Sequence, residues 1–494
     1  MEGGLLTLKV GLIPLDERPV NVRYPRMIGA IAGFDVDLPP AEILSHFRQP
    51  ADCIALADWL RKSAAQWDAL IVSISMLAYG GLLPSRITDD PLLTVLERLE
   101  VLREIKRLQP QLRLYGFDLI TRISKNAASV EEPDHRRESG PLIYRYSQQH
   151  DAHRWGDGPP PETADLNQTY LHDVLRRRAR NHIVNLATLE LLADDVFDLL
   201  VISSDDTSEY GFGTREKIWV KEWIDRRGGD ERLLMYPGAD EVAAALLARA
   251  IVVERGMQPR FFIHYAIEAD AERIAPFEDG PVSLTVQRQI SAVGGRQVDS
   301  AVEADLIVAV NPPAPSNQDF FNPAFAETDR EYRAAALDDF AAQIERWIAD
   351  GQQVIVCDVA YPNGSDPVLV QTLRRHIKLT DLTAYGGWNT AGNTIGVALA
   401  QGIACLRPVD KETAQQFLVH RFVEDHCYMH HVRPTLEATS PRYDDTTVAA
   451  MTAKVERGLK AEMARLPDLR GWRLRNVNLP WQRRFEVDFD LERL

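Results

Sequence analysis

Cysteines are scarce in this chain, and long apolar runs are missing from it. The 494 residues include four cysteines, widely spread and with no CxxC pair, which excludes a scaffold held together by disulfides. No apolar stretch approaches the length of a membrane span, and the first residues are too acidic for a signal peptide. We therefore expect a cytoplasmic protein with reduced, mostly buried thiols and no membrane partner.

Positive charge is also in short supply. The 72 acidic residues outnumber the 56 basic ones and give a formal net charge of -16. A chain of this charge is repelled by a phosphate backbone, so nucleic acid is excluded as a partner. The basic run RRRARNH at residues 176–182 is interpreted as a helix face in water.

Motifs for nucleotide and metal binding are missing as well. The sequence has no GxGxxG, no Walker-type GK[ST] and no HExxH. His426, His430 and His431 have helical spacing without such a motif, and we interpret them as surface or packing residues. We predict no cofactor and no metal.

The sequence does contain a regular alternation of short apolar runs and amphipathic segments. Such runs, each ending in a polar or glycine-rich turn, are typical of βα units with parallel strands. We predict an α/β fold with a (β/α)8-like barrel. A barrel of this kind has eight strands, whereas the sequence has nine candidate runs. Either one run belongs to an inserted unit at 258–300, or the sheet is open. The runs lie at residues 8–19, 69–81, 112–122, 198–206, 232–241, 260–270, 305–313, 353–366 and 382–390.

Two further segments define the expected organisation. Residues 126–170 are polar and rich in proline and glycine, so we expect a functional or mobile loop there, with a lid as one interpretation. The strand rhythm stops after Gly402 and helical patterns follow. We therefore predict a barrel-like catalytic domain at 1–402 and a C-terminal helical subdomain with a strand-like tail at 403–494.

The stretch DLLVISSDDTSEYG at residues 198–211 carries the clearest chemical signal. Asp205 and Asp206 follow directly after a strand that is apolar on both faces, at the edge where the loops of such folds converge. Neighbouring carboxylates in a partly dry site push one pKa up, which leaves one group protonated and the other ionised. This division suits the acid and the charge stabiliser of a glycosidase. Asp194 and Asp195 lie in a turn, and we assign them no role.

Other polar residues at strand ends are candidates for substrate binding. In YGGWNTAGNT (385–394) Trp388 is expected to stack on a sugar, unless the stretch is a turn before a helix and Trp388 fills the core. For Arg18 a structural ion pair is the alternative. The predicted substrate-binding set is Asp16, Glu17, Arg18, Tyr79, Arg86, Asp118, Asp240, Asp358, Asn363, Tyr385, Trp388 and Asn389.

The Asp205-Asp206 pair resembles the pattern of substrate-assisted β-N-acetylhexosaminidases on (β/α) barrels, including the O-GlcNAcase-like group. In those enzymes two adjacent carboxylates follow the fourth strand, and in our count this pair also follows the fourth. The resemblance implies that Asp205 polarises the 2-acetamido group of the sugar and that Asp206 is the general acid/base.

The whole chain also resembles the bacterial domain-of-unknown-function 4127 family. That resemblance brings little function with it. The stretches that carry it are PLDERPVN, MLAYGGLLPSR, RARNHIVN, SSDDTSEYG, GADE, AYGGWNTAGNT and PWQRRFEVD.

We therefore expect an exo-acting β-N-acetylhexosaminidase, with β-N-acetylgalactosaminidase activity included, whose partner is a small carbohydrate. One alternative is a hydrolase or phosphotransferase that binds a divalent metal through Asp16, Asp205, Asp206 and Asp358. Another is a non-catalytic carbohydrate-binding protein. Self-association into a homo-oligomer stays open.

Overall fold

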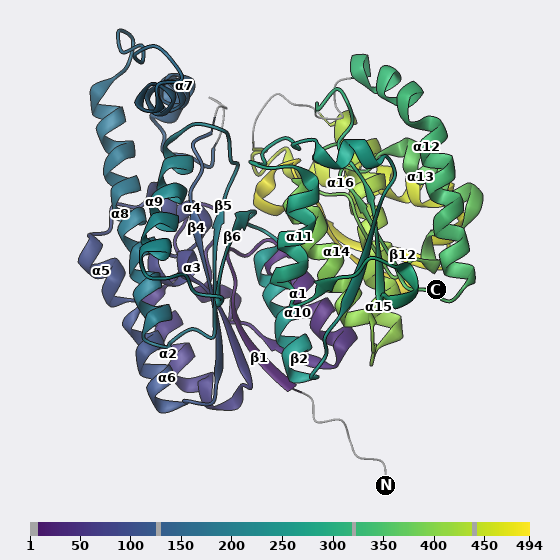
Figure 1. Cartoon of the computed structure of the whole chain (residues 1–494), viewed down its shortest axis with the longest axis horizontal. Helices are drawn as coiled ribbons and strands as arrows, with labels where there is room; N and C mark the ends of the chain where they lie inside the picture. The colour runs from purple at the N-terminus through teal and green to yellow at the C-terminus, as the bar shows by residue number, and fades with distance from the viewer. Residues whose placement is uncertain (1–7, 125–129, 319–322, 437–441) are drawn as a thin grey trace. The chain divides into compact units, whose positions relative to one another are not determined.

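The computed structural model describes residues 8–124, 130–318, 323–436 and 442–494 (Figure 1). The chain divides into two compact units. Unit 1 comprises Met1–Val22 and Asp35–Ala243, and unit 2 comprises Arg23–Phe34 and Ala244–Leu494. This division differs from the predicted one at residue 402, because the helix after Gly402 packs on the same sheet as the segments before it.

Unit 1 is built on a six-stranded sheet with the order β2-β1-β3-β4-β5-β6. The pairs from β1 to β6 are parallel. Strands such as β5 are buried along their whole length, which is why their sequences are continuous apolar runs. The strands are β1 (Leu8–Ile13), β2 (Phe34–Asp37), β3 (Ala69–Ser73), β4 (Arg113–Ile120), β5 (Leu199–Ser204) and β6 (Leu233–Pro237).

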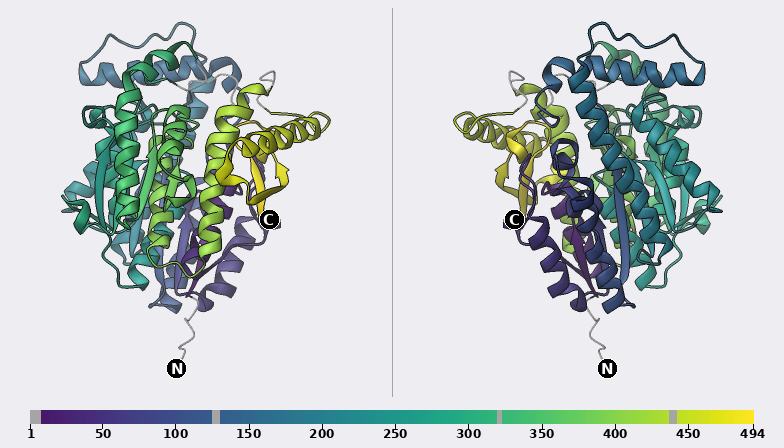
Figure 2. Two further views of the ribbon diagram at one scale, coloured as in Figure 1. Left: turned by 90° about the vertical axis from the view of Figure 1, so that its right-hand side faces the viewer. Right: turned by 90° about the vertical axis from the view of Figure 1, so that its left-hand side faces the viewer.

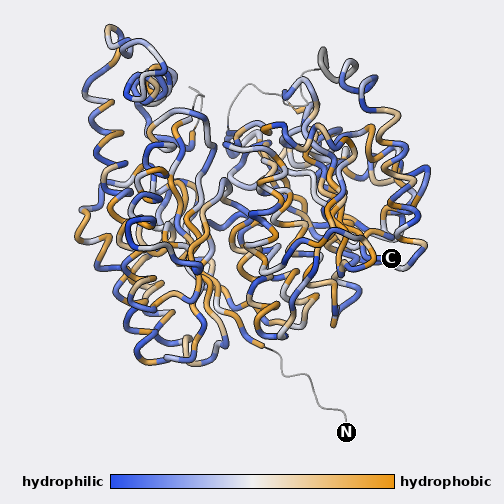
Figure 3. Tube along the Cα trace, in the orientation of Figure 1, coloured by the Kyte–Doolittle hydropathy of each residue, from blue (hydrophilic) through white to orange (hydrophobic). Residues whose placement is uncertain are grey.

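Helices α3, α8 and α9 contact strands β3 to β5 of this sheet (Figure 1). Gly116 in β4 leaves room for Phe197, which stands just before β5, because a Cβ on Gly116 would lie 2.6 Å from the Phe197 ring. The hydrophobic residues gather along the strands (Figure 3). The helices before the second sheet are α1 (Pro19–Ala32), α2 (Cys53–Ser63), α3 (Ile74–Tyr79), α4 (Leu82–Ile87), α5 (Leu92–Glu97), α6 (Glu100–Leu108), α7 (Arg136–Trp155), α8 (Gln168–Ala193), α9 (Phe212–Arg226) and α10 (Val242–Glu254).

Unit 2 contains a five-stranded sheet with the order β11-β10-β9-β7-β8, whose pairs are parallel. An antiparallel hairpin of β12 and β13 lies beside α16 (Figure 2). The strands of unit 2 are β7 (Arg260–Tyr265), β8 (Arg296–Gln297), β9 (Leu306–Asn311), β10 (Val354–Asp358), β11 (Ala384–Gly386), β12 (Trp472–Asn478) and β13 (Asp488–Arg493). The helices that follow α10 in the chain are α11 (Val282–Ala292), α12 (Pro323–Ala349), α13 (Pro367–His376), α14 (Ala391–Cys405), α15 (Lys411–Arg421), a π-helix (Phe422–Val432) and α16 (Val448–Arg465).

The predicted α/β class with parallel strands is confirmed, and each of the nine apolar runs contains a strand. A closed barrel is not confirmed, because the described strands pair in separate sheets of six and five. Residues 258–300 supply β7 and β8 to the second sheet. Because the sequence prediction missed β2, Asp205 and Asp206 follow the fifth strand and not the fourth.

The segment expected to be a loop at 126–170 holds the 20-residue helix α7. The polar composition and Pro141 hid this helix from the sequence analysis, and residues 126–129 lie outside the described part of the chain. The predicted helices and strand-like tail after residue 403 are present as α15, the π-helix, α16 and β13. None of the helices in the described ranges is long and apolar enough to cross a membrane.

Candidate active site

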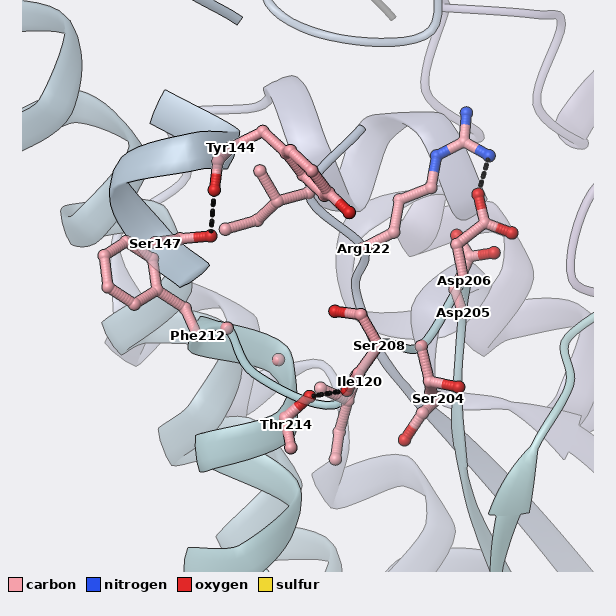
Figure 4. Close-up of a pocket in the computed structure, with 14 residues that line it drawn as sticks. Ile120, Arg122, Tyr144, Ser147, Ser204, Asp205, Asp206, Ser208, Phe212 and Thr214 are labelled. Atoms are coloured by element: carbon pink, nitrogen blue, oxygen red, sulfur yellow. Dashed lines mark hydrogen bonds and ion pairs between the residues drawn. The ribbon is translucent and has the colours of Figure 1, made fainter. Parts of the chain in front are cut away.

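The loops that follow β4 and β5 at the carboxyl edge of the first sheet enclose a hollow (Figure 4). It measures about 370 Å³ when the part open to solvent is counted. It contains Asp205 and Asp206 together with hydroxyl and aromatic side chains. Its lining residues are Ile120, Arg122, Ile123, Tyr144, Ser147, Ser204, Asp205, Asp206, Thr207, Ser208, Gly211, Phe212, Gly213 and Thr214.

The backbone fixes the two aspartates at the end of β5. The amide of Asp205 donates to the carbonyl of Ile120 at 3.1 Å, which extends the pairing with β4 by one residue. Asp206 adopts a φ of 43°, in the left-handed region where aspartate and asparagine are tolerated better than most residues. The chain therefore turns sharply at Asp206.

Each aspartate of the pair forms an ion pair with an arginine. Arg86 Nη2 lies 2.5 Å from Asp205 Oδ2, and Arg122 Nη1 lies 2.8 Å from Asp206 Oδ2. Glu131 Oε2 connects the arginines, at 3.2 Å from Arg86 Nη1 and 2.7 Å from Arg122 Nη2. Each aspartate thus has its own guanidinium, which the sequence analysis did not predict.

The surroundings of the two aspartates differ. Burial, with a further contribution from the charge of Asp205, raises the pKa of Asp206 to about 6, although Arg122 opposes the shift. The Asp206 side chain is surrounded by protein atoms and still keeps 28% of its surface exposed, so it remains in contact with solvent. Asp206 can therefore gain or lose a proton near pH 6.

Helix α8 holds the loops that carry these arginines. Arg178 Nη1 donates to the Thr121 carbonyl at 2.9 Å, next to Arg122. Arg180 and Asn181 donate to the Ser85 carbonyl, next to Arg86, at 3.1 and 2.9 Å. The interpretation of residues 176–182 as a helix face in water is wrong for these three side chains, which are at most 8% exposed. They are buried because backbone carbonyls accept their hydrogen bonds.

Gly80 and Gly81 form the turn between α3 and α4, and α4 is the helix that carries Arg86. Gly80 and Gly81 have φ values of 88° and 128°, which glycine adopts without strain. A Cβ on Gly80 would lie 2.7 Å from the backbone nitrogen of Ala51, so the turn has no room for a side chain. This explains why the stretch YGGLLPSR carries both glycines.

A second cluster joins the loops after β1 and β6, which are not neighbours in the sheet. Arg18 Nη2 lies 2.7 Å from Asp16 Oδ2 and 2.5 Å from Asp240 Oδ1, and all three residues are buried. Glu17 instead accepts from Ser45 Oγ at 2.7 Å and from the Phe47 amide. These contacts favour the ion-pair interpretation of Arg18, and a role of this cluster in substrate binding stays a prediction.

Asp118 and Tyr79 lie in the interior of unit 1. Asp118 accepts from Asn185 Nδ2 and from the Leu119 amide, both at 2.8 Å. Burial raises the pKa of Asp118 to about 7. Burial and the charge of Asp118 raise the pKa of Tyr79, whose ring is covered by Arg180 at 4.7 Å. Neither residue lines the hollow.

The raised pKa of Asp118 predicts a pH-dependent stability. Its contribution to the free energy of unfolding is fully present below pH about 4 and is lost as the pH rises toward 7, because the unfolded chain ionises first. We expect Asp118→Asn to flatten the dependence of Tm on pH across this window. Thermal melts at several pH values measure it, and an unchanged slope would contradict the assignment.

Asp358 and Tyr385 belong to unit 2, in a buried network at the ends of β9, β10 and β11. Asp358 accepts from Asn311 Nδ2 at 2.8 Å, from the Asp366 amide at 2.7 Å and from the Tyr385 hydroxyl at 3.1 Å. Burial and the charge of Asp366 raise the pKa of Asp358 to about 7. Because these oxygens are bonded within the protein, the network is typical of a structural role.

The glycine-rich stretch of unit 2 forms the turn before α14, which begins at Ala391. Trp388 is 3% exposed and makes an edge contact with Phe485 at 5.8 Å. Asn363 and Asn389 both have positive φ and are joined by a backbone hydrogen bond of 3.0 Å. This geometry favours the interpretation of Trp388 as a core residue over that of a sugar platform.

Sequence reasoning missed several residues of the hollow. Arg122 stands at the end of a predicted strand, so the strand-end criterion could have found it. Tyr144 and Ser147 could not be found, because they lie on the unrecognised helix α7. Within the described ranges, no three His, Cys, Asp or Glu side chains group as metal ligands. The metal-dependent alternative therefore gains no ligand set from the geometry.

Comparison with known proteins places the chain in a family without adding an activity. No curated protein and no solved structure matches it. A family profile described as "Protein of unknown function (DUF4127)" matches residues 10–490, which is nearly the whole chain. The protein therefore belongs to the DUF4127 family.

Proposed function

We propose that the protein is a retaining exo-glycosidase that removes a β-linked N-acetylhexosamine by substrate assistance, with N-acetylgalactosamine included among its substrates. One observation carries the proposal. Asp205 and Asp206 line the same hollow, each beside its own arginine, and the pKa of Asp206 is raised to about 6. Two carboxyl groups with different environments supply the charge and the proton that this reaction needs.

The proposed reaction has two steps. Asp206 gives its proton to the glycosidic oxygen while the acetamido oxygen of the sugar attacks the anomeric carbon, which breaks the glycosidic bond and forms an oxazolinium ion. The carboxylate of Asp205 stabilises the positive charge on that ring. Asp206, now ionised, takes a proton from water as the water attacks the anomeric carbon, which restores the acetamido group and the acid.

The lining of the hollow supports a sugar as ligand. Ser204 Oγ has no hydrogen-bond partner among the described residues and is buried. The Tyr144 hydroxyl accepts from Gln148 Nε2 at 2.8 Å, which leaves its own proton to donate. Phe212 and Tyr144 add aromatic surface of the kind that sugar rings contact.

A panel of nitrophenyl glycosides tests the proposal. We expect turnover of a β-N-acetylhexosaminide and little or none of the matching 2-hydroxy sugar. Equal cleavage of the two would exclude participation of the acetamido group. If none is cleaved while glycans raise the Tm, the protein is a carbohydrate-binding protein without catalysis. Activity that is lost with a chelator and restored by magnesium or manganese would select the metal-dependent alternative.

The proposal includes a cytoplasmic site of action. The four cysteines support it, because all are buried and none is in a disulfide. Such thiols are typical of proteins from a reducing compartment.

A further inference from the structure

Helix α7 forms one wall of the hollow. Tyr144 and Ser147, one turn apart on this helix, line it together with the strand ends. In Figure 4 the Tyr144 side chain extends from α7 toward the side where Arg122, Asp205 and Asp206 stand. The shape of the hollow therefore depends on where α7 lies.

A buried carboxylate attaches α7 to the start of α9. Asp151 is 3% exposed, and its Oδ2 accepts from the Gly211 amide at 3.0 Å. Its Oδ1 accepts from Arg215 Nε at 2.7 Å, and the guanidinium of Arg215 lies 4.0 Å from the Trp155 ring centre. Asp151 thus accepts hydrogen bonds from the Gly211 amide, just before α9, and from Arg215 in its first turn. A carboxylate is stabilised at this end of a helix because the helix dipole is positive there.

The apolar contacts of α7 belong to a small cluster that is distinct from the main core of unit 1. Ile143 of α7 packs with Leu166, Leu171 and Val174, and Phe212 lies against this cluster. The strands of the first sheet pack in the other, larger cluster. The place of α7 therefore depends on apolar contacts with α8 and the start of α9, and not on the main core.

We propose that α7 restricts the hollow to the terminal sugar of a chain, with Tyr144 as the specificity-determining residue and Asp151 as the positioning residue. The inference rests on the proposed glycosidase function. A sugar at a chain end needs room on one side only, whereas an internal sugar extends in two directions and would collide with the wall that α7 provides. Exo-action follows from this wall.

The attachment is tested without any substrate. We expect Asp151→Ala to raise hydrogen exchange of the α7 amides by at least about tenfold, because Gly211 and Arg215 lose their buried acceptor. Amides of β4 and β5 should exchange as in the wild type. Glu190→Gln is the matched control, since Glu190 binds Arg227 at the other end of α9 in an exposed ion pair of 2.9 Å. Unchanged α7 exchange in Asp151→Ala would overturn the role of Asp151.

The specificity role is tested with nitrophenyl β-N-acetylhexosaminides that carry a methyl group on O3 or O4, in place of the next sugar. We expect the wild type to reject them, and Tyr144→Ala to raise the kcat/KM ratio of methylated to unmethylated substrate at least about tenfold. Asp151→Ala should raise the same ratio, while Tyr144→Phe, which keeps the ring, should not. A constant ratio in Tyr144→Ala would overturn the inference while leaving the glycosidase proposal intact. If the wild type cleaves no glycoside, the proposed function fails. The hydrogen-exchange measurement still tests whether Asp151 attaches α7 to the start of α9.

Discussion

Asp206→Asn is expected to lower kcat on an alkyl β-N-acetylhexosaminide by about 10²- to 10⁴-fold, which is the contribution of a positioned general acid. Asparagine has the same shape and tolerates the φ of 43° at this position, so the variant removes the proton and leaves the turn in place. The wild-type kcat/KM should fall above pH about 6, as Asp206 loses its proton. Steady-state kinetics across pH measure both effects.

The leaving group provides the control for this prediction. A dinitrophenyl group departs without protonation, so the same variant should lose much less activity on that substrate. Asp195→Asn is the matched control variant, because Asp195 also ends an Asp-Asp pair, with a φ of 55° and an 83% exposed side chain. Equal losses on both leaving groups, or a comparable loss in Asp195→Asn, would contradict the role of Asp206.

Asp205→Asn is expected to lower kcat by about 10²- to 10³-fold, as the loss of one electrostatic stabiliser does. The loss should be similar for alkyl and dinitrophenyl substrates, because Asp205 acts on the acetamido group and not on the leaving oxygen. Arg86 keeps Glu131 as a partner at 3.2 Å, so the loop retains an ion pair. Steady-state kinetics on the two substrates make the comparison. A loss confined to the alkyl substrate would mean that the two aspartates have exchanged roles.

The strands of this protein could be predicted because they are buried on both faces. A strand such as β5 then has a continuous apolar sequence, which is visible without any long-range information. The grouping into sheets could not be predicted in this way. Strand β6 is the edge of its sheet, and this depends on which distant segments pair with each other. The apolar run of an edge strand looks the same in the sequence as that of a strand with two neighbours.

The candidate site shows a similar division. The position of Asp205 and Asp206 after a buried strand identified the hollow, but Asp358 stands at the end of a buried strand as well and is bonded within the protein. The strand-end pattern therefore does not distinguish a carboxylate that lines a hollow from one whose oxygens are bonded within the protein. Arg178 and Arg180 escaped prediction because a run of basic residues in a helix is expected in water, whereas here backbone carbonyls hold them inside.

A series of nitrophenyl β-N-acetylhexosaminides whose acetyl group carries zero to three fluorine atoms tests the central claim most directly. Fluorine withdraws electrons from the amide oxygen and weakens it as a nucleophile, while the leaving group stays the same. If the acetamido group attacks the anomeric carbon beside Asp205, kcat/KM should fall with each fluorine, by about tenfold or more over the series. Equal kcat/KM for all members would contradict the account.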